Sequence, residues 1–223
     1  MSYDEATLTR LREESAQIMG RYPSGHERSA LIPMLHLIQS YDGYVSPDGI
    51  RFCAETLNLT TSEVSAVATF YSQFRRHPGG QYHVGVCTNA LCAVMGGDAV
   101  WDAVSEHLGI ANDGVTEDGS ISLERIECNA ACDYAPVVMV NWEFFDNQTP
   151  AKAIDLVDKL RQGKPVGPTR GPKQVPTFKQ NEHLLAGFED GLVDEGISAG
   201  APSLLGQTIA QEKGWSAPKE ETK

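Results

Sequence analysis

The sequence predicts a protein of the α/β (α+β) class, in which a helical bundle over residues 1–76 precedes an α/β layer domain over residues 80–163. Two changes of pattern indicate this. Apolar residues recur at helical spacing as far as Phe74, and from Tyr82 they fall in short runs typical of strands. Beyond Gly163 the stretch "GKPVGPTRGPKQVPT" is rich in proline, glycine and lysine, so residues 164–223 are expected to form a linker and an extended, irregular tail.

The first region contains successive helical runs with short connections, which is typical of a small antiparallel bundle. Ser24 with Glu27, and Thr60 with Glu63, have the spacing of capping boxes. Pro33 is expected either to kink the second helix or to lie in its first turn. The pattern "SPDGIRFCAETL" starts a further helix, with Ser46 as N-cap and Pro47 in the first helical position. The expected inward positions include Leu8, Leu11, Ser15, Ile18, Leu31, Met34, Leu35, Ile38, Val64 and Val67.

The second region predicts the order β-α-β-β-β-α. The run "QYHVGVC" is a strand, and "NALCAVMGGDAVWDAVSEHLG" is one helix that Gly109 ends. "NDGVTEDGS" is a turn-rich loop. "ISLERIEC" and "PVVMVNWEFFDN" give three strands, of which the last two form a hairpin that turns near Asn141 and Trp142. A helix capped by Thr149 closes the region, which completes an α/β layer fold.

The composition of the chain argues against some classes of function. The chain has 223 residues, 41% of them hydrophobic, with 30 acidic residues against 18 basic ones. A net charge of −12 argues against nucleic-acid binding, which needs a basic face. No stretch has the length and apolarity of a membrane span, and "MSYDEATLTRLREE" has no signal or transit character. We therefore expect a cytoplasmic protein with reduced cysteines.

Four of the five cysteines fall at places that the predicted sheet would bring together. Cys87 ends one strand and Cys92 lies just inside the next helix, whereas Cys128 ends a later strand and Cys132 lies in the loop that follows. The carboxyl ends of parallel strands share one edge of a sheet. If the two strands are neighbours, the four thiols form one pocket. Cys53 lies on the apolar face of a bundle helix and is expected to be a buried, inert thiol.

Four thiolates in one pocket repel one another, so we expect a metal centre whose positive charge offsets theirs. The spacings C-x4-C and C-x3-C make wider loops than zinc knuckles usually have, and they suit a two-iron cluster better. The helix start near Asn89 would place a positive dipole end beside it. Structural zinc, a redox-sensing dithiol and unrelated buried cysteines stay open as alternatives.

The stretches "CTNALC" and "DGSISLERIECNAACDYAPVVMVN" resemble the thioredoxin-like 2Fe–2S ferredoxin family. "SAVATFYSQF" and "LIPMLHLIQSYDGYVSPDGI" also resemble one group in it, the small 2Fe–2S subunits of the NADH-oxidising module of respiratory complex I. The resemblance covers about residues 10 to 165. It implies a thioredoxin-like ferredoxin domain whose cluster ligands are Cys87, Cys92, Cys128 and Cys132.

The resemblance also implies a partner, a flavoprotein subunit that binds NADH and FMN, together with the other complex I subunits. The cluster would take an electron from the flavin and is thought to lie off the main path to quinone. The second loop commonly reads Cys-Leu-Gly-Ala-Cys in the family, and here Ala130 stands in place of the glycine, so a positive φ is less easy there.

We therefore expect one-electron transfer by a subunit of an NADH dehydrogenase complex, with no complete active site on this chain. Gly96 and Gly97 lie inside the predicted helix, so they are interpreted as a close-packing contact and not as a phosphate loop. All-thiolate ligation favours a low potential, roughly −400 mV. The protein would lie peripherally at the cytoplasmic side of the membrane through the complex, without membrane insertion.

Two alternative functions stay open. One is the equivalent subunit of an NAD-linked hydrogenase or formate dehydrogenase, and the other is a zinc-stabilised adaptor protein. The aromatic residues Phe70, Tyr71 and Phe74 either dock the partner or close the bundle core. The tail from residue 181 is expected to be ordered mainly against a partner or not at all.

Overall fold

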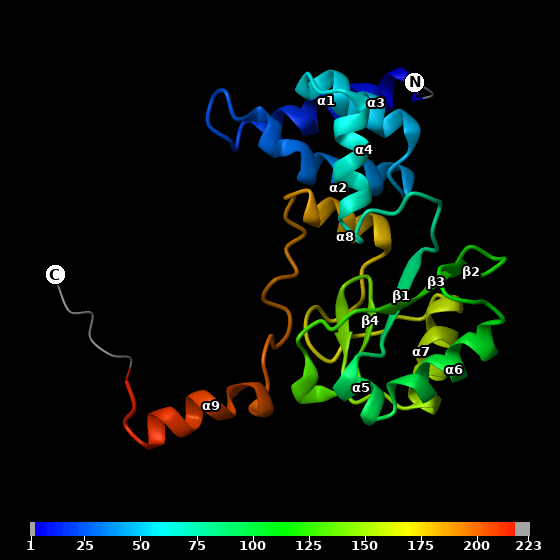
Figure 1. Ribbon diagram of the computed structural model, residues 1–223, viewed down its shortest axis with the longest axis vertical. Coiled ribbons are helices and arrows are strands. Elements are labelled where there is room, and N and C mark those ends of the chain that lie inside the picture. The colour runs from blue at the N-terminus through cyan, green and yellow to red at the C-terminus, as the bar shows by residue number, and fades with distance from the viewer. Residues whose placement is uncertain (1–2, 217–223) are drawn as a thin grey trace.

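The computed structural model describes residues 3–216. Figure 1 shows the helical bundle at one end of the molecule, the sheet with its covering helices at the other, and a C-terminal arm that leaves the body. Apolar residues form one core in the bundle and another in the sheet domain. Within the described part of the chain, none of the helices has the length and apolar character needed to cross a membrane.

The bundle consists of four α-helices and one short 3-10 turn. The bounds are α1 Glu5–Met19, η1 Glu27–Ala30, α2 Leu31–Asp42, α3 Pro47–Leu57 and α4 Thr61–Phe70. Two of the predicted starts are confirmed. The Ser46 side chain accepts from the backbone N–H of Gly49, and Thr60 forms the reciprocal capping box with Glu63.

The predicted capping box of Ser24 and Glu27 is wrong. The chain makes the 3-10 turn η1 here, with His26 at its N-cap and no side-chain cap. The Glu27 carboxylate instead accepts from the backbone N–H of Gly25, which lies in the left-handed region. Pro33 lies in the first turn of α2, where its missing N–H costs no hydrogen bond.

The sheet has five strands in the order β2-β3-β1-β4-β5. Their bounds are β1 Tyr82–Cys87, β2 Gly114–Val115, β3 Ile121–Ile126, β4 Val138–Val140 and β5 Glu143–Phe145. β1 and β3 are parallel, and the other pairs are antiparallel. The β4–β5 hairpin turns at Asn141 and Trp142, both at positive φ, as the sequence predicts. β2 is an additional short strand inside the predicted loop.

Two helices, α6 Gly97–Leu108 and α7 Pro150–Arg161, pack against each other and share one apolar core with the sheet. The predicted single helix over residues 89–109 is divided. A short helix, α5 Ala90–Val94, ends before α6 begins, because Gly96 adopts φ 107° between them. Glycine tolerates this conformation, and the break turns α5 toward the edge of the sheet.

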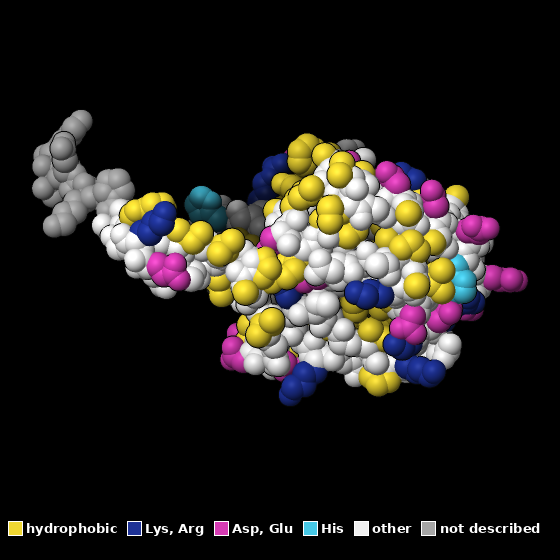
Figure 2. Space-filling model, turned by 90° about the horizontal axis from the view of Figure 1, so that it is seen from below, with side chains coloured by type: hydrophobic (Ala, Val, Ile, Leu, Met, Phe, Trp, Pro, Cys, Tyr) yellow, Lys and Arg dark blue, Asp and Glu magenta, His cyan; other side chains and the backbone are white. Residues whose placement is uncertain are grey.

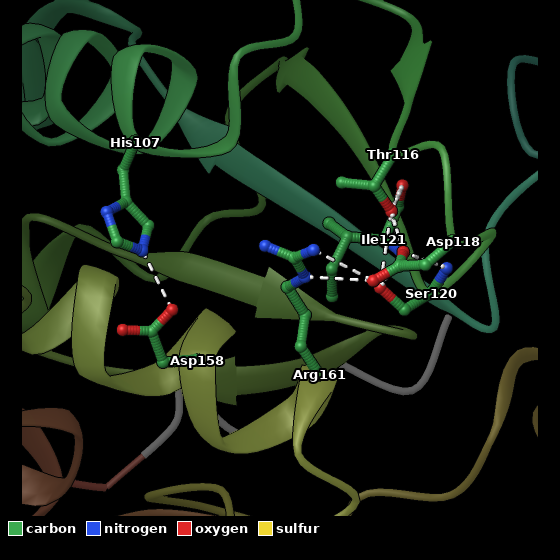
Figure 3. Close-up of polar contacts among 7 residues, drawn as sticks. All are labelled: His107, Thr116, Asp118, Ser120, Ile121, Asp158 and Arg161. Carbon is green, nitrogen blue, oxygen red and sulfur yellow. Dashed lines mark hydrogen bonds and ion pairs between the residues drawn. The ribbon is translucent and has the colours of Figure 1, made fainter.

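The carboxyl end of α7 is tied to the β2–β3 turn (Figure 3). Arg161 donates from Nε and Nη2 to Asp118, at 3.1 and 2.9 Å. Asp118 also accepts from Ser120 and Thr116, and these hydrogen bonds hold the pKa of its carboxyl far below its usual range. One turn earlier in α7, Asp158 contacts His107 of α6, with 2.7 Å between its Oδ1 and Nε2 of the histidine.

The structure differs from the expected irregular tail at residues 178–185 and 201–212, which are helical. α8 Phe178–Leu185 packs against α2, under a capping box of Thr177 and Gln180. Its buried face includes the polar residues Asn181 and Glu182, so the sequence lacks the apolar stripe that would predict this helix. α9 Ala201–Glu212 has no buried residue, and Figure 2 shows it standing away from the body. Residues 217–223 of the predicted tail lie outside the described part of the chain.

Glu143 on β5 gives a test of the packing between the C-terminal segment and the sheet. Burial, helped by the charge of Asp190, raises the pKa of its carboxyl from 4.5 to about 6. The folded state therefore prefers the protonated acid, and stability decreases as the pH rises from the unfolded value through the folded one. Because Glu143 is half-buried, we discount the shift and expect Glu143→Gln to raise the free energy of unfolding by about 1 kcal/mol near pH 7.

Near pH 5 the gain from Glu143→Gln should shrink to less than half, because the Glu143 carboxyl of the folded wild type is then mostly protonated and little charge remains buried. Thermal unfolding of the intact proteins at the two pH values measures this. An equal gain at both pH values would mean that the carboxylate charge is not the cause.

Candidate metal centre

The structure brings the four predicted cysteines to one edge of the sheet. Cys87 is the last residue of β1 and lies opposite Ile126, the last residue of its parallel neighbour β3. Cys128 follows two residues later, Cys92 lies in α5, and Cys132 opens the turn η2 Cys132–Tyr134. All four side chains line one small hollow together with Asn129, Ala131 and Val137. The predicted convergence of two strand ends is confirmed.

The cysteines form one inner and one outer pair. Cys87 and Cys92 are almost fully buried, with 2% and 3% exposure. The Sγ atoms of Cys128 and Cys132 are 3.5 Å apart, and Cys128 is exposed. The hollow therefore has a dry apolar wall and a rim that faces solvent.

Neighbouring thiols help to raise the pKa of Cys92 and of Cys132. Burial is the first cause for Cys92, whose pKa rises to about 11, and the neighbouring Cys87 and Cys132 add to it. The pKa of Cys132 is raised mainly by its contact with Cys128. Four thiolates would not persist here unaided, and a cationic centre is what would let them ionise together.

The residues of the hollow fit a cluster with sulfur atoms. The Asn129 side-chain N–H₂ is buried and has no hydrogen-bond partner, although a buried donor normally has one. A sulfur acceptor in the hollow would satisfy it. The Ala130 backbone N–H already points at Sγ of Cys128, at 3.4 Å. Ala130 has φ 55°, so this loop does need the positive φ that alanine adopts less readily than glycine.

The two cysteine loops also contact each other. Asn89 donates from Nδ2 to Glu127 at 3.0 Å, which joins the start of α5 to the end of β3. α5 has only five residues, so the dipole expected near Asn89 is that of a short helix. The peptide bond between Ala135 and Pro136 is cis.

The buried histidines make other contacts. His83 is a buried residue of β1, its Nε2 lies 3.2 Å from Glu124, and burial lowers its pKa. His36 is buried in the bundle and contacts Glu182. Cys53 is fully buried, and burial raises its pKa to about 12, as expected for an inert thiol. Among residues 3–216, no three His, Cys, Asp or Glu side chains gather as a single metal ion would need.

Sequence reasoning did not find Val137 or Phe144, which complete the apolar wall of the hollow. Both are apolar residues after the cysteine loop, with Val137 directly before β4 and Phe144 in β5, and their spacing carries no sign of a site. They are brought here because β4 lies next to β1 in the sheet and β5 lies next to β4.

Gly97, the first residue of α6, is a close-packing contact, as expected. For Gly96 the expectation is wrong, because an added Cβ there would meet no atom within 4 Å. A Cβ added at Gly97 would lie 2.6 Å from the carbonyl oxygen of Cys87 and 2.8 Å from that of Cys92. We expect Gly97→Ala to push the two cysteine backbones apart, lower stability by about 2 kcal/mol and speed the loss of iron.

Gly206→Ala is the matched control, because an added Cβ there meets no atom within 4 Å. Thermal unfolding and the rate of iron transfer to a chelator measure both variants. Equal behaviour of the two variants would contradict the packing role of Gly97.

Cysteine thiolates are the usual ligands of iron–sulfur clusters, and here two cysteine pairs meet where a parallel strand pair ends, as an iron–sulfur protein requires. The chain belongs to the thioredoxin-like 2Fe-2S ferredoxin family, whose model matches residues 15–161. It is 56% identical over 218 residues to an NADH-quinone oxidoreductase subunit of Mycobacterium tuberculosis, and the match covers 97% of this chain and 85% of that protein.

More distant relatives match a shorter part of the chain. An NADH-quinone oxidoreductase subunit of Rickettsia bellii is 37% identical over 161 residues, 72% of this chain and 94% of that protein. Subunit 2 of the Thermus thermophilus NADH-quinone oxidoreductase is 36% identical over 149 residues, 66% of this chain and 82% of that protein.

Among solved structures, an NAD+-reducing NiFe hydrogenase shares the fold with a TM-score of 0.54 and 18% identity. The likeness covers 60% of this chain and 23% of the hydrogenase chain.

Proposed function

We propose that this chain is the electron-transfer subunit of an NADH:quinone oxidoreductase, complex I, and that Cys87, Cys92, Cys128 and Cys132 hold its one 2Fe–2S cluster. The observation that carries the proposal is the meeting of two cysteine pairs where β1 and β3 end. Relatives named as NADH-quinone oxidoreductase subunits support the choice of complex.

The hydrogenase alternative is not favoured, because that likeness lies at the level of fold, with 18% identity. Formate dehydrogenase and a zinc-stabilised adaptor have no observation in their favour. NADH and FMN belong on the flavoprotein partner, and the complex would hold the chain at the cytoplasmic side of the membrane.

The chain's residues suit one-electron exchange. When bound, a 2Fe–2S cluster takes up or releases one electron with little change in its ligands. The buried Cys87 and Cys92 exclude water from the inner side of the hollow, and the exposed Cys128 brings the outer side to the surface. The N–H groups of Ala130 and Asn129 supply donors that favour negative charge on sulfur.

Metal analysis and reduction by NADH test this function. The purified chain should be red-brown, with two irons and two acid-labile sulfides, and should give a paramagnetic signal on reduction. NADH should reduce it only when the flavoprotein subunit is present. A colourless protein that contains zinc would overturn the proposal in favour of the adaptor.

The three aromatic residues near the end of α4, Phe70, Tyr71 and Phe74, differ in burial. Phe74 is buried in the bundle core, whereas Phe70 is 80% exposed and Tyr71 is 43% exposed. We propose that Phe70 and Tyr71 contact the flavoprotein partner. Phe70→Ser should weaken co-purification with that subunit and leave iron content unchanged, and Ile32→Ser, at a position that is 40% exposed on α2, is the control. Undiminished co-purification would exclude Phe70 from the interface.

A further inference from the structure

The segment that follows the family-matched region returns to the cysteine site along β5. Arg170 forms an antiparallel bridge with Phe144, and the backbone N–H of Thr169 donates to the carbonyl of Phe144 at 2.8 Å. The Thr169 hydroxyl also accepts from the N–H of Asp146, at 3.0 Å. These contacts place residues 169–170 as an added edge beside the last strand of the sheet.

The Arg170 side chain is held in a fixed orientation. Its Nε and Nη2 atoms donate to the two carboxylate oxygens of Asp146, at 2.9 and 2.8 Å. Both side chains are largely buried, with 13% and 5% exposure. The guanidinium also faces two rings, with its Cζ atom 4.9 Å from the centre of Tyr134 and 4.4 Å from that of Phe144. A planar, bidentate and stacked guanidinium has no equivalent in lysine.

Both rings belong to the cysteine site. Tyr134 ends the turn that begins at Cys132, and Phe144 packs against the apolar wall that includes Cys87 and Cys92. The backbone carbonyl of Tyr134 accepts from the N–H of Asn147, at 2.8 Å. Arg170 thus contacts one residue from the outer loop and one from the inner wall.

The same segment reaches the outer loop a second time. The Ser203 hydroxyl at the start of α9 donates to Asp133, the residue after Cys132. Gly200 lies so close to Tyr134 that a Cβ there would overlap the tyrosine hydroxyl. The outer loop is therefore contacted by residues 170, 200 and 203, all of them beyond the matched residues 15–161.

We propose that Arg170 is a positioning residue for the 2Fe–2S cluster, and that it holds the loop of Cys128 and Cys132 in place by stacking on Tyr134. This inference rests on the proposed cluster site. The outer cysteines need such support because Cys128 faces solvent and its loop carries a strained Ala130. An outer partner of a metal ligand affects both metal retention and the electronic properties of the site.

Arg170→Lys tests the proposal, because lysine keeps the positive charge but can neither donate two parallel hydrogen bonds to Asp146 nor stack a planar group on Tyr134. Arg161→Lys is the matched control, since Arg161 makes a similar two-donor contact with Asp118 at the β2–β3 turn (Figure 3). Full-length proteins loaded with the cluster are compared by iron transfer to a chelator and by the paramagnetic spectrum of the reduced state. We expect Arg170→Lys to lose iron roughly tenfold faster with an altered spectrum, and Arg161→Lys to match the wild type in both.

Tyr134→Leu gives a second, independent variant, because it removes the stacked ring and leaves the pair of Arg170 and Asp146 intact. It should speed iron loss as Arg170→Lys does, and the double variant should be no worse than the more severe single one. Additive effects would overturn the proposed route through Tyr134. A wild-type protein without iron would defeat the proposed function. An iron-loaded wild type, with Arg170→Lys indistinguishable from Arg161→Lys, would defeat only the positioning role.

Discussion

Cys128→Ser is expected to abolish the 2Fe–2S cluster. Cys128 lies at the exposed rim of the hollow, and its Sγ is 3.5 Å from that of Cys132. A serine hydroxyl gives up its proton far less readily than a thiol, and a metal ligand must be deprotonated to bind. Iron content should therefore fall from two atoms per chain to near zero, with loss of visible absorbance and of the reduced-state paramagnetic signal.

The contrast between positions makes this prediction specific. Cys87→Ser should lose the cluster as well, and it should also lower stability, because it places a hydroxyl in the buried wall of the hollow. Cys53→Ala is the control, since Cys53 lies in the bundle core and should leave iron content unchanged. An unaltered paramagnetic signal in both serine variants would refute the ligand assignment.

Glu182→Ala is expected to have the largest effect on stability. The Glu182 side chain is fully buried, and its Oε2 lies 2.7 Å from Nδ1 of His36 and 2.7 Å from Nε2 of Gln39. Its other oxygen accepts from Nε1 of Trp142, at 3.4 Å. Alanine would leave buried donors without an acceptor and open a cavity, so we expect a loss of about 3–5 kcal/mol.

The position of Glu182 predicts a second effect of Glu182→Ala, beyond the loss of stability. His36 and Gln39 belong to α2 of the bundle, whereas Trp142 lies in the β4–β5 turn, so Glu182 joins the two parts of the molecule through α8. Thermal unfolding of Glu182→Ala should separate into two transitions, one for each part. Glu189→Ala, at an exposed position just after α8, should remain within about 0.5 kcal/mol of the wild type. A single transition at the wild-type temperature would show that Glu182 does not couple the parts.

Local patterns determined much of this protein. The strands "QYHVGVC" and "ISLERIEC" each end at a cysteine or within two residues of one, and neighbouring parallel strands share an edge, so the sequence predicts the cysteine pocket if the two strands are neighbours. The pairing of β1 with β3 meets that condition. The helix starts at Ser46, Thr60 and Thr149 were equally readable, because a cap and the backbone groups it satisfies lie within three residues.

Features that depend on distant partners were decided only by the tertiary structure. The buried face of α8 carries Glu182, whose acceptor atoms are satisfied by His36 and Gln39, more than 140 positions earlier in the chain. Arg170 stands in a stretch that has the composition of a linker, yet it is fixed by Asp146 and by Tyr134. A buried polar residue adds nothing to the apolar pattern of the sequence, because specific hydrogen-bond partners, and not an apolar side chain, make its burial possible. Those partners are chosen by the packing of β5, α2 and the C-terminal segment, which no local pattern contains.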